Sequence, residues 1–571
     1  MSHRNGKCEN KKCARGCDTK VCILGQKKLQ KEVIIRKPGR YCFFENAIWN
    51  PQTGGDCNFP AAGITIASNN VTIDLNGYTY SQQTNVNGQP LVQFAVGIKI
   101  NPGVQNVIIR NGTMEKFASY GIYAKATVGN DISTLLIEDM TMRFCGLNSS
   151  VSDGLQLAPC GNILFFGNGA GCIGLFGTVN ELGAQAAFLK KFVIRNCRLL
   201  EYGVVTGADN DGIRLTCSVN GLIENCIIKG TSPDVVTVSA GVGGIENIFG
   251  KDLIIKDCEI SDINAANFYA TGIALLFVFQ SQVINTTITE VFQTGVLVPS
   301  LLGGAVTVVN ATGIKMLTCP NSKIQNCVVN DVTSELTVND VGFSSGAQAV
   351  LITESANCLV ENCTLFNTNY NGNVGFAAGI TTSSNNSVFK NNQINNVKSD
   401  TGQNWGIRVE QYNQGGFFFP VPFVPVFGNV FELCVIENVG NFSLSNVNQG
   451  GLLIRNDGGF VNENNIVQNC IMRGNIGHGI LIDGAQSQNN IVQNNKLSKN
   501  TLDGINDSTG LSSNKNVYIG NEAYKNGANN YVGFSNATGV PISVWNLSGN
   551  SLPFSSSAAP FTNRFDNLDI L

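Results

Sequence analysis

Residues 192–199 read FVIRNCRL, and the same pattern returns as GLIENCII in residues 221–228 and as LIIKDCEI in residues 253–260. Each copy contains an apolar residue, any residue, Asn or Asp, Cys, any residue and an apolar residue. Further copies, often without the Cys, are centred on Asn111, Asp139, Asn285, Asn326, Asn362, Asn391, Leu433, Asn469, Asn494 and Asn521. Consecutive copies lie mostly 25–42 residues apart, which indicates a repeat architecture.

A second motif, x-Gly-Ile-x-apolar with Leu or Val in some copies, lies between the copies of the first. Examples are YGIYA at Gly121, DGIRL at Gly212, WGIRV at Gly406 and HGILI at Gly479. Apolar residues alternate over three to five positions between Asn- and Gly-rich turns, which predicts short strands and no sustained helix. Strands this short cannot bury a core alone, so each coil must stack on the next. The sequence therefore predicts a parallel β-solenoid.

The cysteines of the first motif share one position, directly after the Asn or Asp, or after Leu433 in the copy where Leu replaces Asn. They are Cys197, Cys226, Cys258, Cys327, Cys363, Cys434 and Cys470. We expect these thiols to point inward as small apolar residues, and not to bind metal or act as nucleophiles. We expect the preceding Asn or Asp to take the left-handed bend and to bond its counterpart in the next coil.

These motifs, with NNVTIDLNGYTY (residues 69–80) and NVIIRNGT (106–113), resemble the right-handed parallel β-helix proteins of the pectate-lyase-like superfamily. That group is similar in fold to polygalacturonases, pectate lyases and phage tailspikes. The resemblance implies an all-β, single-stranded right-handed parallel β-helix of about 14 or more coils over residues 41–535. Residues 1–40 would form a basic, Cys-rich head, and residues 536–571 a C-terminal cap.

Composition narrows the function. Only 13% of the 571 residues are charged and 43% are hydrophobic, which is a globular composition. Residues 1–40 hold 12 Lys and Arg against 3 Asp and Glu, so the rest of the chain is acidic and broad nucleic-acid binding by it is not expected. No apolar stretch reaches the ~18 residues of a membrane span. The polar N-terminus does not resemble a classical signal peptide.

The best catalytic candidates lie in GADNDGIRL (residues 207–215), with one more acidic residue expected on a neighbouring coil. They are Asp209, Asp211, Arg214 and Asp153. Asn210-Asp211-Gly212 looks like part of the polygalacturonase Asn-Thr-Asp-Gly motif, and Gly477-His478-Gly479 looks like its Gly-His-Gly. Because 267 residues separate Asp211 from His478, the two cannot share one active site. The alternative is that Asp before Gly is a turn residue.

Other polar and aromatic residues suggest binding chemistry. Sugar-stacking faces could come from Tyr120, Tyr123, Trp405 and Arg408, although packing is the alternative role. Carboxylates expected at strand ends, from which a calcium site could be built, are Glu354, Glu410, Asp457, Asp483 and Asp507. The head contains Cys8, Cys13, Cys17 and Cys22, which form either disulfides or crosslinks, or alternatively a zinc site. No other cofactor is expected.

Two functions remain open from the sequence. The first is a non-enzymatic surface protein of a particle: a rigid rod that binds a glycan or partner and is attached to particle or capsid-layer proteins through residues 1–40. The Asn- and Cys-rich composition resembles surface proteins of large DNA viruses, which implies a virion or other extracellular particle surface. The second is a polysaccharide lyase or polygalacturonase-like hydrolase acting on an acidic glycan. Both leave open whether the chain forms a homo-oligomer.

Overall fold

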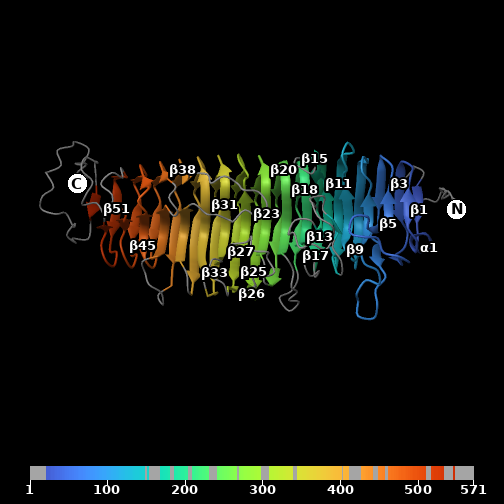
Figure 1. Ribbon diagram of the computed structural model, residues 1–571, viewed down its shortest axis with the longest axis horizontal. Helices are drawn as coiled ribbons and strands as arrows, with labels where there is room; N and C mark the ends of the chain where they lie inside the picture. Colours follow the sequence, from blue (N-terminus) through green and yellow to red (C-terminus); the bar gives the residue numbers. More distant parts are fainter. Residues whose placement is uncertain are drawn as a thin grey trace. The chain divides into compact units, whose positions relative to one another are not determined.

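The computed structural model describes residues 21–147, 151–152, 168–179, 185–202, 209–230, 241–266, 269–297, 308–338, 344–373, 375–400, 403–410, 426–441, 448–456, 461–509, 516–532 and 544–546. The chain divides into two compact units, Met1–Gln282 and Val283–Leu571. Each unit is built from parallel strands that pair with the equivalent strand one coil later (Figure 1).

Strands of the first unit form three columns. The first column holds β2 (Val33–Ile35), β5 (Ala61–Ile66), β8 (Ala95–Ile100), β10 (Tyr120–Lys125), β13 (Asn168–Phe176), β18 (Asp209–Glu224), β20 (Gly241–Lys256) and β23 (Tyr269–Phe279). The second holds β3 (Gly39–Phe43), β6 (Val71–Asp74), β9 (Gln105–Glu115), β11 (Ile132–Arg143), β16 (Leu189–Arg195) and the second halves of β18 and β20. The third holds β4 (Ala47–Trp49), β7 (Thr79–Gln82), the ends of β9 and β11, β17 (Arg198–Leu200), β19 (Ile227–Lys229) and β21 (Glu259–Ser261).

The second unit repeats this plan. Its first column holds β27 (Val308–Leu317), β31 (Ser344–Ala356), β34 (Gly375–Asn385), β37 (Gln403–Glu410), β41 (Gln449–Arg455), β45 (His478–Asp483), β49 (Ile505–Asp507) and β52 (Tyr531–Val532). The second holds β28 (Lys323–Gln325), β32 (Leu359–Glu361), β35 (Val388–Lys390), β39 (Val430–Glu432), β43 (Ile466–Gln468), β47 (Ile491–Gln493) and β50 (Val517–Ile519). The third holds β25 (Thr287–Thr294), β29 (Val328–Ser334), β33 (Thr364–Tyr370), β36 (Gln393–Ser399), β40 (Val435–Val439), β44 (Ile471–Arg473), β48 (Lys496–Ser498), β51 (Asn521–Tyr524) and β53 (Val544–Asn546).

The x-Gly-Ile motif shapes the first column, because Gly and Ile both point into the core. At Gly406 a Cβ would lie 2.2 Å from Cγ2 of the buried Ile436, so only glycine fits there. The Ile of each coil stacks on that of the next and is fully buried, as for Ile64, Ile98 and Ile122. Because two consecutive residues point inward, the residues before and after the Gly-Ile pair lie together on the outer face.

The corners between the second and third columns follow the Asn-Cys motif. The bend residue is left-handed in twelve of the predicted copies, with φ from 49° to 61°, including Leu433. Asn225 Nδ2 donates to Asn196 Oδ1 at 2.8 Å, one step of the expected amide ladder. All seven cysteines of the motif are at most 3% exposed, which confirms their inward position.

The last copy of the motif differs from the prediction. The left-handed residue there is Gly520, and Asn521 is buried in the position that Cys470 occupies earlier in the unit. Asn495 lies between these two and accepts a hydrogen bond from the Cys470 backbone N–H at 2.9 Å. Asn495 Nδ2 in turn donates to Asn521 Oδ1 at 3.0 Å. A buried amide ladder thus replaces the thiol stack at this end of the unit.

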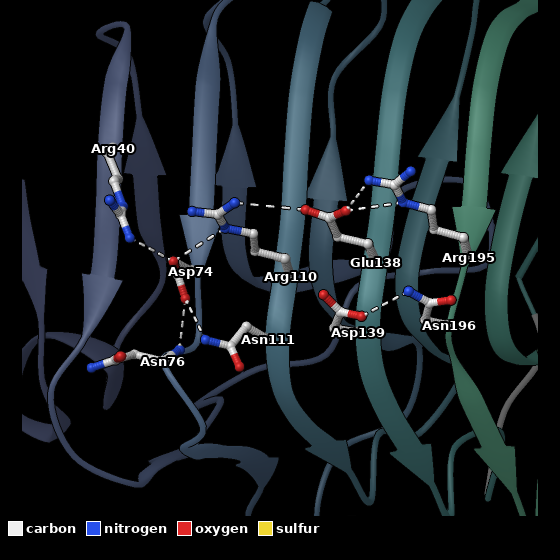
Figure 2. Close-up of polar contacts among 9 residues, drawn as sticks. All are labelled: Arg40, Asp74, Asn76, Arg110, Asn111, Glu138, Asp139, Arg195 and Asn196. Carbon is white, nitrogen blue, oxygen red and sulfur yellow. Dashed lines mark hydrogen bonds and ion pairs between the residues drawn. The ribbon is translucent and has the colours of Figure 1, made fainter. Parts of the chain in front are cut away.

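The outer face of the second column in the first unit carries alternating charges. This charged ladder, in register from strand to strand, consists of Asp74, Arg110, Glu138, Arg195, Glu224 and Lys256. Figure 2 shows its first four members, and also Arg40 of β3, which donates a hydrogen bond to Asp74. Arg195 Nη2 lies 2.7 Å from Glu138 Oε2, and this contact raises the pKa of the guanidinium. Each charge is therefore compensated by its neighbours within the chain.

The predicted fold class is confirmed: the described residues form an all-β, parallel β-helix with eight levels in the first column of each unit. Residues 1–20, and all of 536–571 except Val544–Asn546, lie outside the described residues, and the bounds predicted for the head (1–40) and the cap (536–571) stay a prediction. A short helix, α1 (Gln26–Leu29), follows β1 (Val21–Leu24). No helix in the described ranges is long and apolar enough to span a membrane.

Candidate functional site

The outward residues of x-Gly-Ile-x form two rows on each unit, and these rows hold most of the predicted site residues. In the first unit the row before Gly includes Tyr120 and Asp211, and the row after Ile includes Tyr123 and Arg214. In the second unit Trp405 and His478 precede Gly, and Arg408 follows Ile. The repeat thus brings chemistry from distant sequence segments onto one face of each unit.

Asp211 and Arg214 do meet in the first unit, together with a carboxylate from the next coil. Arg214 Nη1 lies 2.9 Å from Asp211 Oδ2 and also contacts Glu246 Oε2. All three side chains are at most 2% exposed. We call these residues the Arg214 cluster. A guanidinium between two carboxylates is well suited to hold the two strands together, and the catalytic role of Asp211 and Arg214 stays a prediction.

Aromatic side chains pack beside the Arg214 cluster. Tyr120, Tyr123 and Phe176 are buried, with ring centroids 5.7 Å apart from Phe176 to either tyrosine. Glycine lies between the aromatic and charged groups, and a Cβ on Gly169 would lie 2.7 Å from Arg214 Cδ. The predicted tyrosines therefore pack in this structure as a buried cluster.

Several predicted residues fall outside what the structure describes. Asp153 and the head cysteines Cys8, Cys13 and Cys17 lie outside the described residues, as does Asp457, and the side chains of Asp209 and Cys22 do too. Their predicted roles stay predictions: catalytic for Asp153 and Asp209, calcium-binding for Asp457, and disulfide-forming or zinc-binding for the cysteines. Among the described ranges, no group of three or more His, Cys, Asp or Glu side chains could hold a metal ion.

In the second unit, four buried side chains form what we call the β37 cluster: Phe376, Trp405, Arg408 and Glu410. Register places Arg408 beside Thr381 of β34, and Phe376 lies near the start of that strand. The Arg408 guanidinium carbon lies 4.1 Å from the centroid of the Phe376 ring, a cation–π contact. Arg408 Nη2 also contacts Glu410 Oε1.

The β37 cluster contains buried polar atoms that have no hydrogen-bond partner among the described residues. They are Nε and Nη1 of Arg408, Oε2 of Glu410 and Nε1 of Trp405. Arg408 is 8% exposed, Glu410 3% and Trp405 fully buried. Leaving such groups unpaired costs about 1–3 kcal/mol each, and more for charged groups. Three donors and one acceptor on neighbouring outward positions therefore indicate a place for a hydrogen-bonding ligand.

A histidine–aspartate pair lies two strands away in the same row. His478 Nδ1 is 3.1 Å from Asp503 Oδ2, and both side chains are nearly buried. Burial alone raises the pKa of Asp503, but bonds from His478, Asn529 and Asn506 outweigh it and lower that pKa below its ordinary value. Between Trp405 and His478 the row is occupied by Gly450, whose φ of 156° and contact with the His478 backbone exclude any side chain.

The edge of this face reaches solvent at Asp483. Glu410, Arg455 and Asp483 are in register on β37, β41 and β45. Arg455 Nε donates to Asp483 Oδ2 at 3.0 Å, and the Asp483 side chain is 35% exposed. A ligand reaching the β37 cluster would meet this charged pair at its edge.

Repeat alignment could have found the residues that the sequence reasoning missed. Glu246 follows Gly244-Ile245 as Arg214 follows Gly212-Ile213, and Asp503 precedes Gly504-Ile505 as His478 precedes Gly479-Ile480. Phe376 has no such signal, because it lies outside the motif.

The family comparison agrees with the fold. Residues 179–394 match the family described as right handed beta helix region. Comparison with curated protein sequences finds no match. The chain is similar to the tailspike protein of E. coli bacteriophage HK620 in complex with pentasaccharide, at 11% identity over 84% of this chain and 72% of that one, with a TM-score of 0.35. It is similar to the A-module of the Azotobacter vinelandii mannuronan C-5 epimerase AlgE6, at 10% identity over 87% and 90%, with a TM-score of 0.34.

A third similar structure is the Dettilon tailspike protein, at 11% identity and a TM-score of 0.34. The match covers 65% of this chain and spans 59% of the tailspike. The family match within residues 179–394 and the parallel strand pairing both indicate a parallel β-helix.

Proposed function

We propose that the protein binds a glycan through the β37 cluster, and that the bound unit is an acidic sugar. The carrying observation is the set of unpaired buried polar atoms on Trp405, Arg408 and Glu410. Sugars present hydroxyl groups that accept and donate at once, which matches a site with donors and an acceptor side by side. Two guanidinium nitrogens of Arg408 favour a sugar that also carries a carboxylate.

The aromatic residues of the cluster fit the same ligand. Phe376 fixes the Arg408 guanidinium from one side, so the cation is positioned before the ligand arrives. Trp405 packs with Leu453 and Leu481, which holds its indole in place. A fixed cation and a fixed N–H lose little freedom on binding, and this favours specific recognition.

Calorimetric titration of the full chain with oligouronates, and with neutral oligosaccharides of the same length, tests the proposal. Oligouronates should bind more tightly. Trp405→Phe keeps an aromatic ring but removes the N–H, and it should weaken binding about 3- to 10-fold. Arg408→Met should weaken binding about 30-fold or more, because it removes charged donors from a buried site.

Arg473 supplies a matched control. It pairs with Glu437 in the same unit but is 56% exposed. Arg473→Met should leave oligouronate binding unchanged, and circular dichroism should show that every variant is folded. Failure of the unmodified protein to bind either class of oligosaccharide would refute the proposal, and so would unchanged binding by folded Trp405→Phe and Arg408→Met chains.

We also propose, from the sequence alone, that residues 1–40 attach the protein to a particle surface through crosslinked cysteines. Twelve basic residues and four cysteines in this segment support an anchoring role. Mass spectrometry of the native protein with and without reductant should detect the crosslinks. Four thiols that all react with an alkylating reagent before reduction would contradict this role.

A further inference from the structure

A row of aliphatic side chains lies next to the charged ladder on the outer face of the first unit. The row consists of Ile108, Leu136, Val193, Leu222 and Ile254, with Thr72 at the first level. All of them are partly exposed, although the inward residues on either side are buried. A regular apolar row at the surface is typical of a surface that contacts another protein.

The order of charges in the ladder determines what could cover this face. Read from β6 to β20 the signs are minus, plus, minus, plus, minus, plus. Read in the opposite direction they are plus, minus, plus, minus, plus, minus. The ladder is therefore complementary to itself when the order of levels is reversed, and a second copy of the chain supplies that reversed order.

A two-fold axis parallel to the strands, between β11 and β16, reverses the order of levels in the second copy. The charged ladder of one copy then faces the ladder of the other, and the two aliphatic rows face each other. Glu138 then faces Arg195 of the second copy, and Arg195 faces its Glu138. Further along, Arg110 faces Glu224, and Asp74 faces Lys256. We propose that the first unit forms an antiparallel homodimer through this face, with the aliphatic row at its centre. The inference concerns a different unit from the β37 cluster and does not depend on the proposed function.

The corner residues that flank the ladder agree with this arrangement. Under the same axis, Asp139 lies opposite Asn196, and Asn111 lies opposite Asn225, so no acidic residue meets another. An axis through a level instead of between levels would place like charges opposite each other. An axis along the direction of stacking would place the ladder opposite the left-handed residues on the other side of the aliphatic row. Only two of these six residues are charged, so the alternating charges of the ladder would have no partners; the six are Asn70, Asn106, Thr134, Lys191, Asn220 and Asp252.

The size of the face sets the expected strength. Six levels at about 4.8 Å cover only ~24 Å along the stack. This is smaller than the faces of tight protein complexes, so we expect a reversible dimer. The dissociation constant of the dimer should lie in the range of about 10–300 μM. High salt should weaken association because the contacts at the rim are charged.

Sedimentation of the full chain over this concentration range gives the first test. Glu138→Arg and Arg195→Glu each place like charges opposite each other twice in a homodimer, and each should weaken self-association at least about tenfold. Mixed together, the two variants restore opposite charges at both contacts, so a heterodimer should form. Mixing leaves the contacts inside each variant chain unchanged. Recovery of association on mixing can therefore come only from contacts between the two chains.

Lys229→Glu is the matched control, because Lys229 is an exposed basic residue paired with Asp262 away from this face. It should associate like the unmodified protein. If a reversed-charge chain does not fold, Glu138→Gln and Arg195→Gln remove the charges singly and should still weaken association. A monomer at every concentration, unchanged association in folded Glu138 and Arg195 variants, or mixing without recovery would each overturn the proposal.

Discussion

Replacing Arg214 by Met should be among the most destabilising single changes in the protein. Arg214 contacts both Asp211 and Glu246, and all three are at most 2% exposed. Methionine fills the space of the aliphatic stem but leaves two buried carboxylates without their shared cation. Breaking one buried ion pair lowers the free energy of unfolding by about 3–5 kcal/mol. Because two carboxylates lose the same partner here, we expect Arg214→Met to lower the free energy of unfolding by an amount near the upper end of that range.

Arg110→Met is the matched control. Arg110 also contacts two carboxylates, those of Asp74 and Glu138, but its side chain is 34% exposed. Asp74 keeps Arg40, and Glu138 keeps Arg195, so neither carboxylate is left alone. Arg110→Met should lower the free energy of unfolding by about 0–1 kcal/mol, as expected for the loss of an exposed ion pair.

Equilibrium unfolding in urea, followed by tryptophan fluorescence, measures both changes. Adding Asp211→Asn and Glu246→Gln to Arg214→Met removes both charges and should recover much of the stability. Equal losses for Arg214→Met and Arg110→Met, or no recovery in the triple variant, would refute the reasoning.

Three further predictions follow from other contacts. Burial raises the pKa of Asp74, but bonds from Arg40, the Asn76 backbone N–H and the Asn111 side chain, with the charge of Arg110, lower that pKa overall. The stabilising effect of Asp74 is therefore present above pH ~4 and lost as the pH falls further, so Asp74→Asn should reduce stability at pH 7 but not near pH 2 in urea titrations. The Cys226 thiol donates a hydrogen bond to Cys197, and this bond together with burial raises the pKa of Cys226 to about 12. Iodoacetamide at pH 8.5 should therefore modify Cys226 only after unfolding, as measured by mass spectrometry. Asn495→Ala removes buried hydrogen bonds to two backbone groups and should lower the free energy of unfolding by about 2–4 kcal/mol. Asn494→Gly, at the neighbouring left-handed bend, should lower it by less than about 1 kcal/mol.

Much of the fold could be predicted from the sequence because each coil repeats the same local requirements. The inward thiols and left-handed Asn residues follow from spacing alone, since neighbouring coils impose the same backbone path. The misplaced bend at Asn521 shows where this reasoning ends. Asn can take the left-handed bend or fill the core, and only the preceding Gly520 and the register with Asn495 distinguish the two positions.

The candidate sites could be predicted only in part. Trp405, Arg408 and Glu410 carry polar or aromatic groups in recognisable strands, so each could be named as a candidate. Their lack of hydrogen-bond partners depends on packing around β37, which the sequence pattern does not contain. The contact from Arg214 to Glu246 joins residues on successive coils, so it required the strand register.

The alternating ladder restricts how the protein can gain or lose length. Loss of residues 196–224, a single turn of the solenoid, would bring Arg195 next to Lys256. Loss of residues 139–224 would bring Glu138 next to Lys256 and keep opposite signs adjacent. Evolutionary or engineered changes within this stretch should therefore be tolerated in even numbers of turns and selected against in odd ones.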